Sequence, residues 1–244
     1  MKYPYCIFDL YGTLVDIHTD EGSPLLWEKM ALFYSAYGAL YQPEELKAAY
    51  FRLVRQEVDE SRALRQNDFE GHPEIRLERI FAALFQEKNL EADSDMAIHM
   101  GHLFRRHSME YIRLYDGAEE LLRALRANGQ KVYLLTNAQR IFTEMELRDL
   151  KIDALFDGIW ISSDYGCKKP DPKFFHLLLD SCKIPVEQAI MVGNDGVCDI
   201  QGGKAVGLST LYIRSNISPK EPLPNADYVL ESMDLKKAQQ ILTQ

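Results

Sequence analysis

After residue 115 the chain alternates short apolar runs with helix-like segments, and this alternation constrains the fold more than any other feature. Helix starts and ends separate the runs; Asp171 followed by Pro172, for example, is typical of a helix N-terminus. The apolar runs cover residues 131–135, 158–162, 189–192, 209–213 and 228–230. Such alternation is typical of parallel strands joined by crossover helices. The sequence therefore predicts an α/β protein built on a doubly wound parallel sheet.

The N-terminal part of the chain departs from this alternation. An apolar run at residues 5–8 predicts a first buried strand that stops at Asp9, before a turn at Gly12. Apolar residues then recur at helical spacing in four segments between about residues 25 and 111, as in a small helical bundle. We therefore expect an α/β core and an inserted α-helical cap, with bounds of residues 1–16 and 114–244 for the core and 17–113 for the cap.

Polar side chains follow four of the predicted strands. In chain order they are Asp9 with Thr13, then Thr136 with Asn137, then Lys168 with Lys169, and finally Asn194 with Asp195 and Asp199. Parallel sheets of this kind bind ligands at the carboxyl ends of their strands. We therefore expect these groups to converge on one site that combines a carboxylate, a hydroxyl, a lysine and an acidic turn.

The order and spacing of the four groups resemble the four motifs of the haloacid-dehalogenase-like hydrolase superfamily. The match is to the subfamily with a helical cap inserted between motifs one and two, and it covers nearly the whole chain. A single motif is weakly specific, because the DxxGT pattern from Asp9 to Thr13 can occur by chance. Four motifs in order at strand ends are strongly specific.

The resemblance implies that Asp9 is a nucleophile that forms a covalent aspartyl intermediate. Thr136 and the backbone amides after Asp9 would hold the anionic group of the substrate. Lys169 would orient Asp9 and neutralise charge. Lys168 competes for that role, but the family spacing favours Lys169.

Other side chains near the motifs have less certain roles at this level. Thr13, Asn137 and Tyr11 are candidate substrate-binding residues. Thr13 fits a turn cap equally well, and Asn137 and Asp199 fit a supporting or capping role equally well. In the cap, Arg62, Arg65 and His72 are candidate substrate contacts, although solvated surface charge explains each of them better.

A magnesium site is the expected cofactor site. In phosphatases of this family Mg²⁺ binds the nucleophile, a backbone carbonyl two residues later and an acid of motif four. The matching positions are Asp9, Tyr11 and Asn194. Asn194 stands where an aspartate is usual, and an amide oxygen can ligate Mg²⁺ without adding charge. The adjacent Asp195 is the alternative ligand.

Tyr11 is the second departure from the phosphatase pattern, in which this position is an aspartate that protonates the leaving group and then activates water. General acid–base assistance is worth about 10²–10⁴-fold in rate. A phenol titrates near pH 10 in its unperturbed state, so Tyr11 is a poor substitute. A phosphatase with Tyr11 is therefore expected to favour good leaving groups, such as acyl or aryl phosphates.

Three functions remain open at this level. The first is a Mg²⁺-dependent phosphatase of a small phosphorylated metabolite. The second is a metal-independent 2-haloacid dehalogenase, because the segment Asp9–Thr13, with Tyr11, resembles the first motif of those enzymes. Other dehalogenase features are missing: Trp27 is followed by Glu28 and Lys29 where dehalogenases place an arginine beside a tryptophan, and Phe175 replaces their tyrosine. The third is a non-catalytic or phospho-switch binding protein on the same fold.

Composition narrows the partners. The net charge of −9 disfavours nucleic acid and requires local cations at an anion site. We see no signal peptide and no apolar segment long enough to cross a membrane, so a cytoplasmic protein is expected. The four cysteines include no CxxC pair and are expected to be thiols. The expected partner is a small anionic molecule, and the chain could be a monomer or a homodimer.

Overall fold

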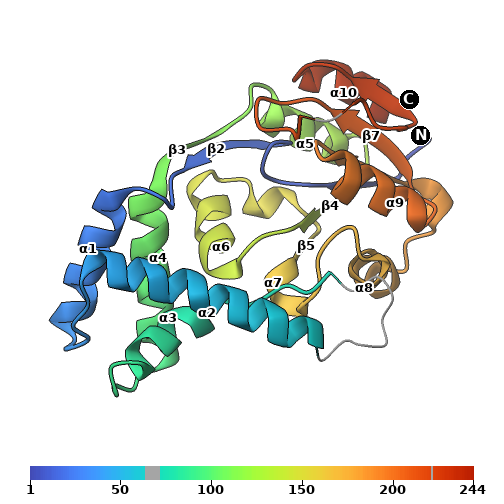
Figure 1. Cartoon of the computed structure of the whole chain (residues 1–244). Coiled ribbons are helices and arrows are strands. Elements are labelled where there is room, and N and C mark those ends of the chain that lie inside the picture. The colour runs from blue at the N-terminus through green and yellow to red at the C-terminus, as the bar shows by residue number, and fades with distance from the viewer. Residues whose placement is uncertain (64–71, 221) are drawn as a thin grey trace.

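The core is a six-stranded parallel sheet with the strand order β5-β4-β1-β6-β7-β8 in the computed structural model, which describes residues 1–63, 72–220 and 222–244 (Figure 1). Its strands are β1 (Tyr5–Phe8), β4 (Lys131–Thr136), β5 (Gly158–Ile161), β6 (Ala189–Gly193), β7 (Ser209–Ile213) and β8 (Tyr228–Leu230). The predicted doubly wound sheet is confirmed. Because β1 lies between β4 and β6, Asp9 emerges at the centre of the carboxyl edge.

Successive strand residues point to opposite sides of the sheet. Both faces are buried, because helices pack against each of them. Phe8 joins a buried cluster with side chains of α5 (Ala118–Ala127) and α10 (Leu235–Leu242). Its neighbour Ile7 joins a cluster on the other face with side chains of α8 (Pro172–Cys182). Helix α8 begins as predicted, with the Asp171 carboxylate accepting a hydrogen bond from the Lys173 amide at 2.9 Å.

Four helices form the cap, as predicted, and lie to one side of the sheet (Figure 1). They are α1 (Pro24–Ala36), α2 (Pro43–Ala63), α3 (Leu77–Gln86) and α4 (Ser94–Ser108). Large aromatic side chains fill the cap interior: the Trp27 ring lies 5.3 Å from that of Tyr50 and 5.8 Å from that of Phe104, between centroids. These contacts give the cap its own hydrophobic core.

An antiparallel ribbon of β2 (Val15–Thr19) and β3 (Met109–Leu114) connects the cap to the core. No sequence pattern predicted this ribbon, and the expected domain boundaries after residues 16 and 113 fall within its two strands. Asp16 pairs in register with Arg113, whose guanidinium donates to the Asp16 carboxylate at 2.7 and 2.9 Å. This cross-strand pair supports the connection.

The cap meets the core at two further places. Ile141 and Phe142 of α6 (Arg140–Asp149) join the cap cluster, whereas Leu147 of the same helix joins a sheet cluster. Burying one such large apolar side chain contributes about 1.5–3 kcal/mol. The segment just before α3 also lies beside α7 (Ser162–Tyr165) (Figure 1). Pro73 of this segment pairs with Cys167, two residues after α7. Arg65 and most of the expected loop from residue 65 to 73 lie outside the described residues.

No helix in the described ranges is both long and apolar enough to cross a membrane. The four cysteines, all of which lie in the described ranges, form no disulfide with one another. Two of them, Cys6 and Cys167, are buried in the core.

Candidate functional site

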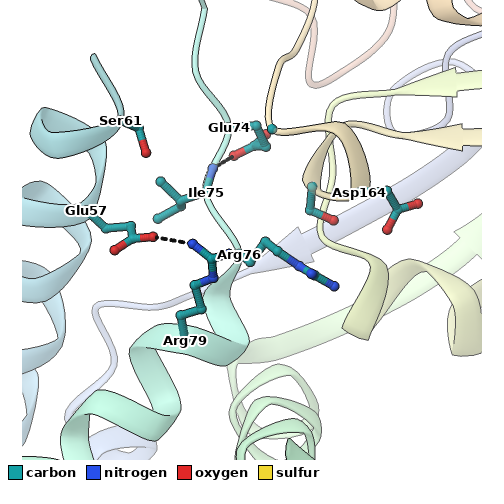
Figure 2. A pocket seen from close by; sticks show the side chains of 9 residues that line it. Glu57, Ser61, Glu74, Ile75, Arg76, Arg79 and Asp164 are labelled. Carbon is teal, nitrogen blue, oxygen red and sulfur yellow. Dashed lines mark hydrogen bonds and ion pairs between the residues drawn. The ribbon is translucent and has the colours of Figure 1, made fainter. Parts of the chain in front are cut away.

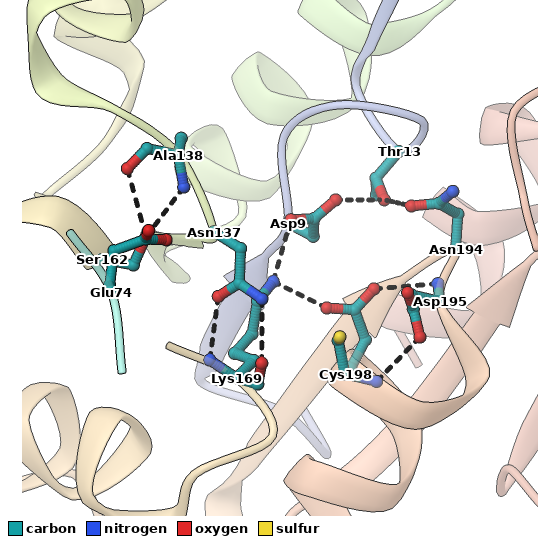
Figure 3. Close-up of polar contacts among 11 residues, drawn as sticks. Asp9, Thr13, Glu74, Asn137, Ala138, Ser162, Lys169, Asn194, Asp195 and Cys198 are labelled. Atoms are coloured by element: carbon teal, nitrogen blue, oxygen red, sulfur yellow. Dashed lines mark hydrogen bonds and ion pairs between the residues drawn. The ribbon is translucent and has the colours of Figure 1, made fainter. Parts of the chain in front are cut away.

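Asp9, Lys169 and Asp199 form a buried charged cluster at the carboxyl edge of the sheet (Figure 3). The Lys169 ammonium lies 2.8 Å from Asp9 Oδ1 and 2.6 Å from Asp199 Oδ1. Burial alone would lower the pKa of Lys169, but the carboxylates of Asp199 and Asp9 outweigh burial and hold this pKa above its usual value. Lys169 is therefore a permanent cation that holds the Asp9 carboxylate in place.

The neighbouring Lys168 is placed differently. Its side chain is 40% exposed, and its ammonium lies 3.9 Å from the Glu74 carboxylate. Of the two competing lysines, only Lys169 reaches Asp9.

Asp199 was weighed above only as a supporting residue, and the structure makes it the second anionic partner of Lys169. It lies in the helical turn Gly196–Gln201, after β6. Burial raises the pKa of Asp199 in spite of Lys169, and the charge of Asp9 adds to the increase. Its Oδ2 also accepts a hydrogen bond from the Asp195 amide at 3.0 Å.

Thr13 joins motif one to motif four. Its hydroxyl lies 3.1 Å from Asp9 Oδ2 and 3.2 Å from Asn194 Oδ1. One hydroxyl proton can serve only one of these two acceptors at a time. Two oxygen atoms, one charged and one neutral, therefore converge with spare acceptor capacity. Gly12 permits this approach, because its φ is +87° and an added Cβ would lie 2.3 Å from the Asn194 amide.

Asn137 positions the lysine loop rather than the nucleophile directly. Its amide nitrogen donates to the Lys169 carbonyl at 2.9 Å, and its amide oxygen accepts from the Lys169 backbone N–H at 2.8 Å. This reciprocal pair joins motif two to motif three. Asn137 also lines the pocket that contains Asp9, so it can contact a bound molecule.

Thr136, at the end of β4, is fully buried, and its hydroxyl makes no hydrogen bond to any described residue. An unsatisfied buried polar group costs about 1–3 kcal/mol. Such a hydroxyl needs a partner, and an oxygen of an anion bound beside Asp9 could accept its hydrogen bond. This orphaned group is the feature that fits an anion-binding role for Thr136.

Asp195 has an identifiable local task. One of its carboxylate oxygens accepts hydrogen bonds from the Val197 and Cys198 amides at 2.8 and 2.7 Å, which caps the helical turn Gly196–Gln201. The Asp195 side chain also lines the pocket. Burial raises the pKa of the adjacent Cys198 thiol to about 12, so this thiol is protonated at neutral pH.

The hydrogen bonds of the Tyr11 phenol do not suit proton transfer to a substrate. It donates to the Glu146 carboxylate of α6 at 2.5 Å and lies 3.0 Å from the Thr143 hydroxyl. Glu146 is in turn paired with Arg105 of the cap helix α4 at 2.6 Å. Burial and then the Glu146 charge raise the pKa of Tyr11 well above 10. Sequence reasoning missed Glu146 and Arg105, since nothing local in the sequence links them to Tyr11.

Several pockets lie near the cap–core boundary, and two of them border the motif loops. The first, of about 300 Å³, is lined by Glu57, Arg76, Arg79 and neighbouring residues, and Arg79 pairs with Glu57 (Figure 2). Arg76 pairs with Glu78. The second, of about 200 Å³, contains Asp9 and Lys169 and is also lined by Ile217 and Pro219. The nucleophile candidate lies in the smaller pocket, so that pocket is the candidate active site.

The described residues that line this smaller pocket have an unbalanced charge. They include three aspartates, at positions 9, 195 and 199, but a single cation, Lys169. The two candidate cap contacts that the structure describes add no cation to the lining: Arg62 has a 67% exposed side chain beside Asp59, and His72 contributes its carbonyl to the Lys168 amide. An anionic substrate therefore meets excess negative charge unless another cation is present.

The oxygen atoms around Asp9 fit a hard cation. Asp9 Oδ2, Asn194 Oδ1 and the Tyr11 carbonyl are the type of ligands that Mg²⁺ prefers, and the first two already converge on Thr13. The described residues contain no cluster of three or more His, Cys, Asp or Glu side chains arranged for a metal ion. A metal bound here would therefore depend on amide, carbonyl and water oxygens in addition to Asp9.

Comparison with known proteins identifies the family. The family model for haloacid dehalogenase-like hydrolases matches residues 3–207. The chain belongs to this family. The predicted family membership is therefore confirmed, and the protein is a hydrolase of the haloacid dehalogenase superfamily.

Relatives within the family act on different substrates. A glyceraldehyde 3-phosphate phosphatase of Pyrococcus abyssi is 33% identical over 43% of this chain and 44% of its own length. A 5'-nucleotidase of Pseudomonas aeruginosa is 24% identical over 99% of this chain and 96% of its own length. The crystal structure of a 2-haloacid dehalogenase from Pseudomonas syringae has a TM-score of 0.64 at 20% identity, covering 99% and 98% of the two chains.

These likenesses do not separate phosphatase from dehalogenase. The chain spans between 44% and 59% of the lengths of three curated relatives that it matches at 29–33% identity. The haloacid dehalogenase-like fold is shared by both kinds of enzyme. The choice between them therefore depends on the chemistry of the site.

Proposed function

We propose that this haloacid dehalogenase-like hydrolase is a Mg²⁺-dependent phosphatase of a small phosphorylated metabolite. The observation that carries the proposal is the charge of the pocket, which is lined by three aspartates and one lysine, with Asp9 and Asp199 in contact with Lys169. One divalent cation would offset the excess negative charge of the pocket and allow a phosphate to approach Asp9. Relatives named as a glyceraldehyde 3-phosphate phosphatase and a 5'-nucleotidase support phosphate ester chemistry.

The proposed reaction has two steps. A carboxylate oxygen of Asp9 attacks phosphorus, the bond from phosphorus to the leaving oxygen breaks, and that oxygen departs with the electron pair. Water then hydrolyses the aspartyl phosphate and releases inorganic phosphate. Lys169 orients Asp9 through its 2.8 Å contact, and the Thr136 hydroxyl is available to donate to a phosphoryl oxygen.

Mg²⁺ would be held by Asp9, Asn194 and the Tyr11 carbonyl. When bound, it supplies positive charge to the phosphoryl group. Asp195 is the less suitable ligand, because one of its oxygens already accepts two backbone hydrogen bonds.

Metal removal tests the proposal directly. Hydrolysis of p-nitrophenyl phosphate is expected to stop in EDTA and to return when Mg²⁺ is added in excess. The release of p-nitrophenol, followed by absorbance across a Mg²⁺ titration, measures this dependence. Asn194→Asp should raise the apparent Mg²⁺ affinity, because a carboxylate replaces a neutral ligand next to Thr13. Equal turnover in EDTA and in Mg²⁺ would contradict the proposal.

The leaving group should matter more than in a phosphatase that has a carboxylic acid at position 11. The single phenol proton of Tyr11 is donated to Glu146, and the raised pKa of Tyr11 prevents the phenol from acting as a base. Acetyl phosphate and p-nitrophenyl phosphate are therefore expected to turn over about 10²–10⁴-fold faster than an alkyl phosphate such as glycerol 3-phosphate. Phosphate release, measured for all three substrates under the same conditions, gives the ratio.

Tyr11→Phe is the matched control for this prediction. It removes the phenol hydroxyl but keeps the ring and the backbone carbonyl, so the preference for good leaving groups should remain within about threefold of that of the unmodified chain. A collapse of the preference in Tyr11→Phe would instead identify Tyr11 as the acid that assists the leaving group.

A 2-haloacid dehalogenase is the second candidate, and Tyr11 favours it because halide leaves without a proton. The position of Trp27 weighs against it. Trp27 is buried in the aromatic core of the cap and donates to the Glu21 carbonyl at 2.8 Å, so its ring is not available to receive halide beside Asp9. Chloride release from 2-chloropropionate without metal would favour the dehalogenase over the phosphatase.

A further inference from the structure

Residues 72–77, which lead into the cap helix α3, lie against two of the motif loops. The Lys168 amide donates to the His72 carbonyl at 3.0 Å, and the Glu74 amide donates to the Gly166 carbonyl at 3.1 Å. The side-chain amide of Gln139, two residues after Asn137, accepts from the Leu77 amide and donates to the Ile75 carbonyl, both at 3.0 Å. The cap segment is thus bonded to the loops that contain Asn137 and Lys169.

Glu74 occupies the centre of this contact, and its side chain is only 10% exposed. One carboxylate oxygen accepts from the Ser162 hydroxyl at 2.9 Å. The other accepts from the Gln139 side chain at 3.3 Å and lies 3.9 Å from the Lys168 ammonium. One carboxylate therefore contacts α7, the loop after β4 and the loop that leads to Lys169.

A path of hydrogen bonds and covalently linked groups leads from Glu74 to the nucleophile (Figure 3). The Ser162 hydroxyl accepts from the Ala138 amide at 2.8 Å, and its one proton is shared between the Glu74 carboxylate at 2.9 Å and the Ala138 carbonyl at 3.1 Å. Ala138 follows Asn137, whose side-chain amide forms the reciprocal pair with the Lys169 backbone. The Lys169 ammonium then holds Asp9. Each connection is a direct contact between packed or adjacent groups.

We propose that Glu74 is a positioning residue that couples the cap to Lys169 and Asp9, an inference that rests on the proposed phosphatase activity. Glu74 comes from the cap side of the chain but touches no atom of the nucleophile. It sets the orientation of Ser162, and Ser162 holds the loop that carries Asn137. When the segment containing Glu74 is seated, the Asn137–Lys169 pair is held in the geometry that aims the ammonium at Asp9.

Glu57 offers a matched control because it lines the same 300 Å³ pocket as Glu74 (Figure 2). Its carboxylate pairs with Arg79 at 3.2 Å. Ser162, Gln139 and Lys168 are not among the described hydrogen-bond or ion-pair partners of the Glu57 side chain. Removing Glu57 therefore removes a pocket carboxylate without removing support from the motif loops.

Three variants test the proposal: Glu74→Ala, Glu74→Gln and Glu57→Ala. Because small misplacements of catalytic groups can cost about 10²-fold in rate, Glu74→Ala should lower kcat for p-nitrophenyl phosphate by about 10- to 100-fold and leave KM within about threefold. Glu74→Gln should restore kcat to within about threefold, because its amide can donate to Ser162 and accept from Gln139. Glu57→Ala should match the unmodified enzyme.

Hydrogen–deuterium exchange supplies a readout that does not depend on turnover. Peptides covering residues 136–142 and 166–171 should exchange faster in Glu74→Ala than in the unmodified chain, Glu74→Gln or Glu57→Ala. Unchanged exchange in these peptides together with unchanged kcat would overturn the proposal. So would equal losses of kcat in Glu74→Gln and Glu74→Ala. An unmodified chain with no phosphatase activity would remove the proposed function, while the exchange data would still test the positioning role.

Discussion

Replacing Lys169 with methionine should abolish hydrolysis and lower the free energy of unfolding by about 3–5 kcal/mol. Lys169 is buried between the carboxylates of Asp9 and Asp199, at 2.8 and 2.6 Å. Methionine fills a similar volume but leaves two close carboxylates without a counter-charge. Urea denaturation in metal-free buffer measures the loss of stability, and p-nitrophenyl phosphate hydrolysis measures the loss of activity.

The stability loss in Lys169→Met should shrink as the pH falls. Burial already raises the pKa of Asp199 in the unmodified chain, and removing the ammonium removes the main influence that opposes this shift. Above the pKa of an unfolded aspartate, the folded variant then binds more protons than the unfolded chain, so its stability decreases with rising pH. Lys173→Met, an exposed substitution on α8, is the control and should stay within about 0.5 kcal/mol at every pH. A pH-independent loss would contradict the charge explanation.

Replacing Asp9 with asparagine should lower activity at least about 10⁴-fold, because the amide cannot act as the nucleophile. The fold should not suffer. Asparagine keeps an oxygen that can accept from Lys169, and the repulsion between Asp9 and Asp199 disappears. We therefore expect unchanged stability or a gain of about 1 kcal/mol in the metal-free protein.

Denaturation and mass spectrometry together check the Asp9 prediction. Incubation with acetyl phosphate or beryllofluoride should produce a covalent or tightly bound adduct in the unmodified chain but not in Asp9→Asn. Asp95→Asn, an exposed change near the start of α4, should behave like the unmodified chain in both measurements. Substantial turnover by Asp9→Asn would exclude Asp9 as the nucleophile.

A difference in stability between these two inactive variants would separate catalysis from folding. Asp9→Asn should be inactive and stable, whereas Lys169→Met should be inactive and unstable. The difference follows from the charges of the cluster, in which one ammonium offsets two carboxylates. Removing a repelling anion relieves the buried site, and removing its cation does the reverse.

Much of the fold could be predicted because its signals are local. Strands β7 and β8 have the bounds expected from their apolar runs, and α8 begins at the expected Asp171 cap. The ribbon of β2 and β3 was missed because its two strands mix charged and polar residues with apolar ones and contain no continuous apolar run. Its stability depends on pairing between segments almost 100 positions apart, such as Asp16 with Arg113.

The amino-acid sequence alone determined the α/β class, the helical insertion and the candidate nucleophile Asp9, because strand periodicity and residues at strand ends are properties of neighbouring positions. Tertiary structure decided which lysine reaches Asp9 and where the phenol proton of Tyr11 goes. Tyr11 meets Glu146 across 135 positions, and Lys169 meets Asp9 across 160. The physical reason is that burial and charge pairing act between side chains that only the folded sheet and cap bring together.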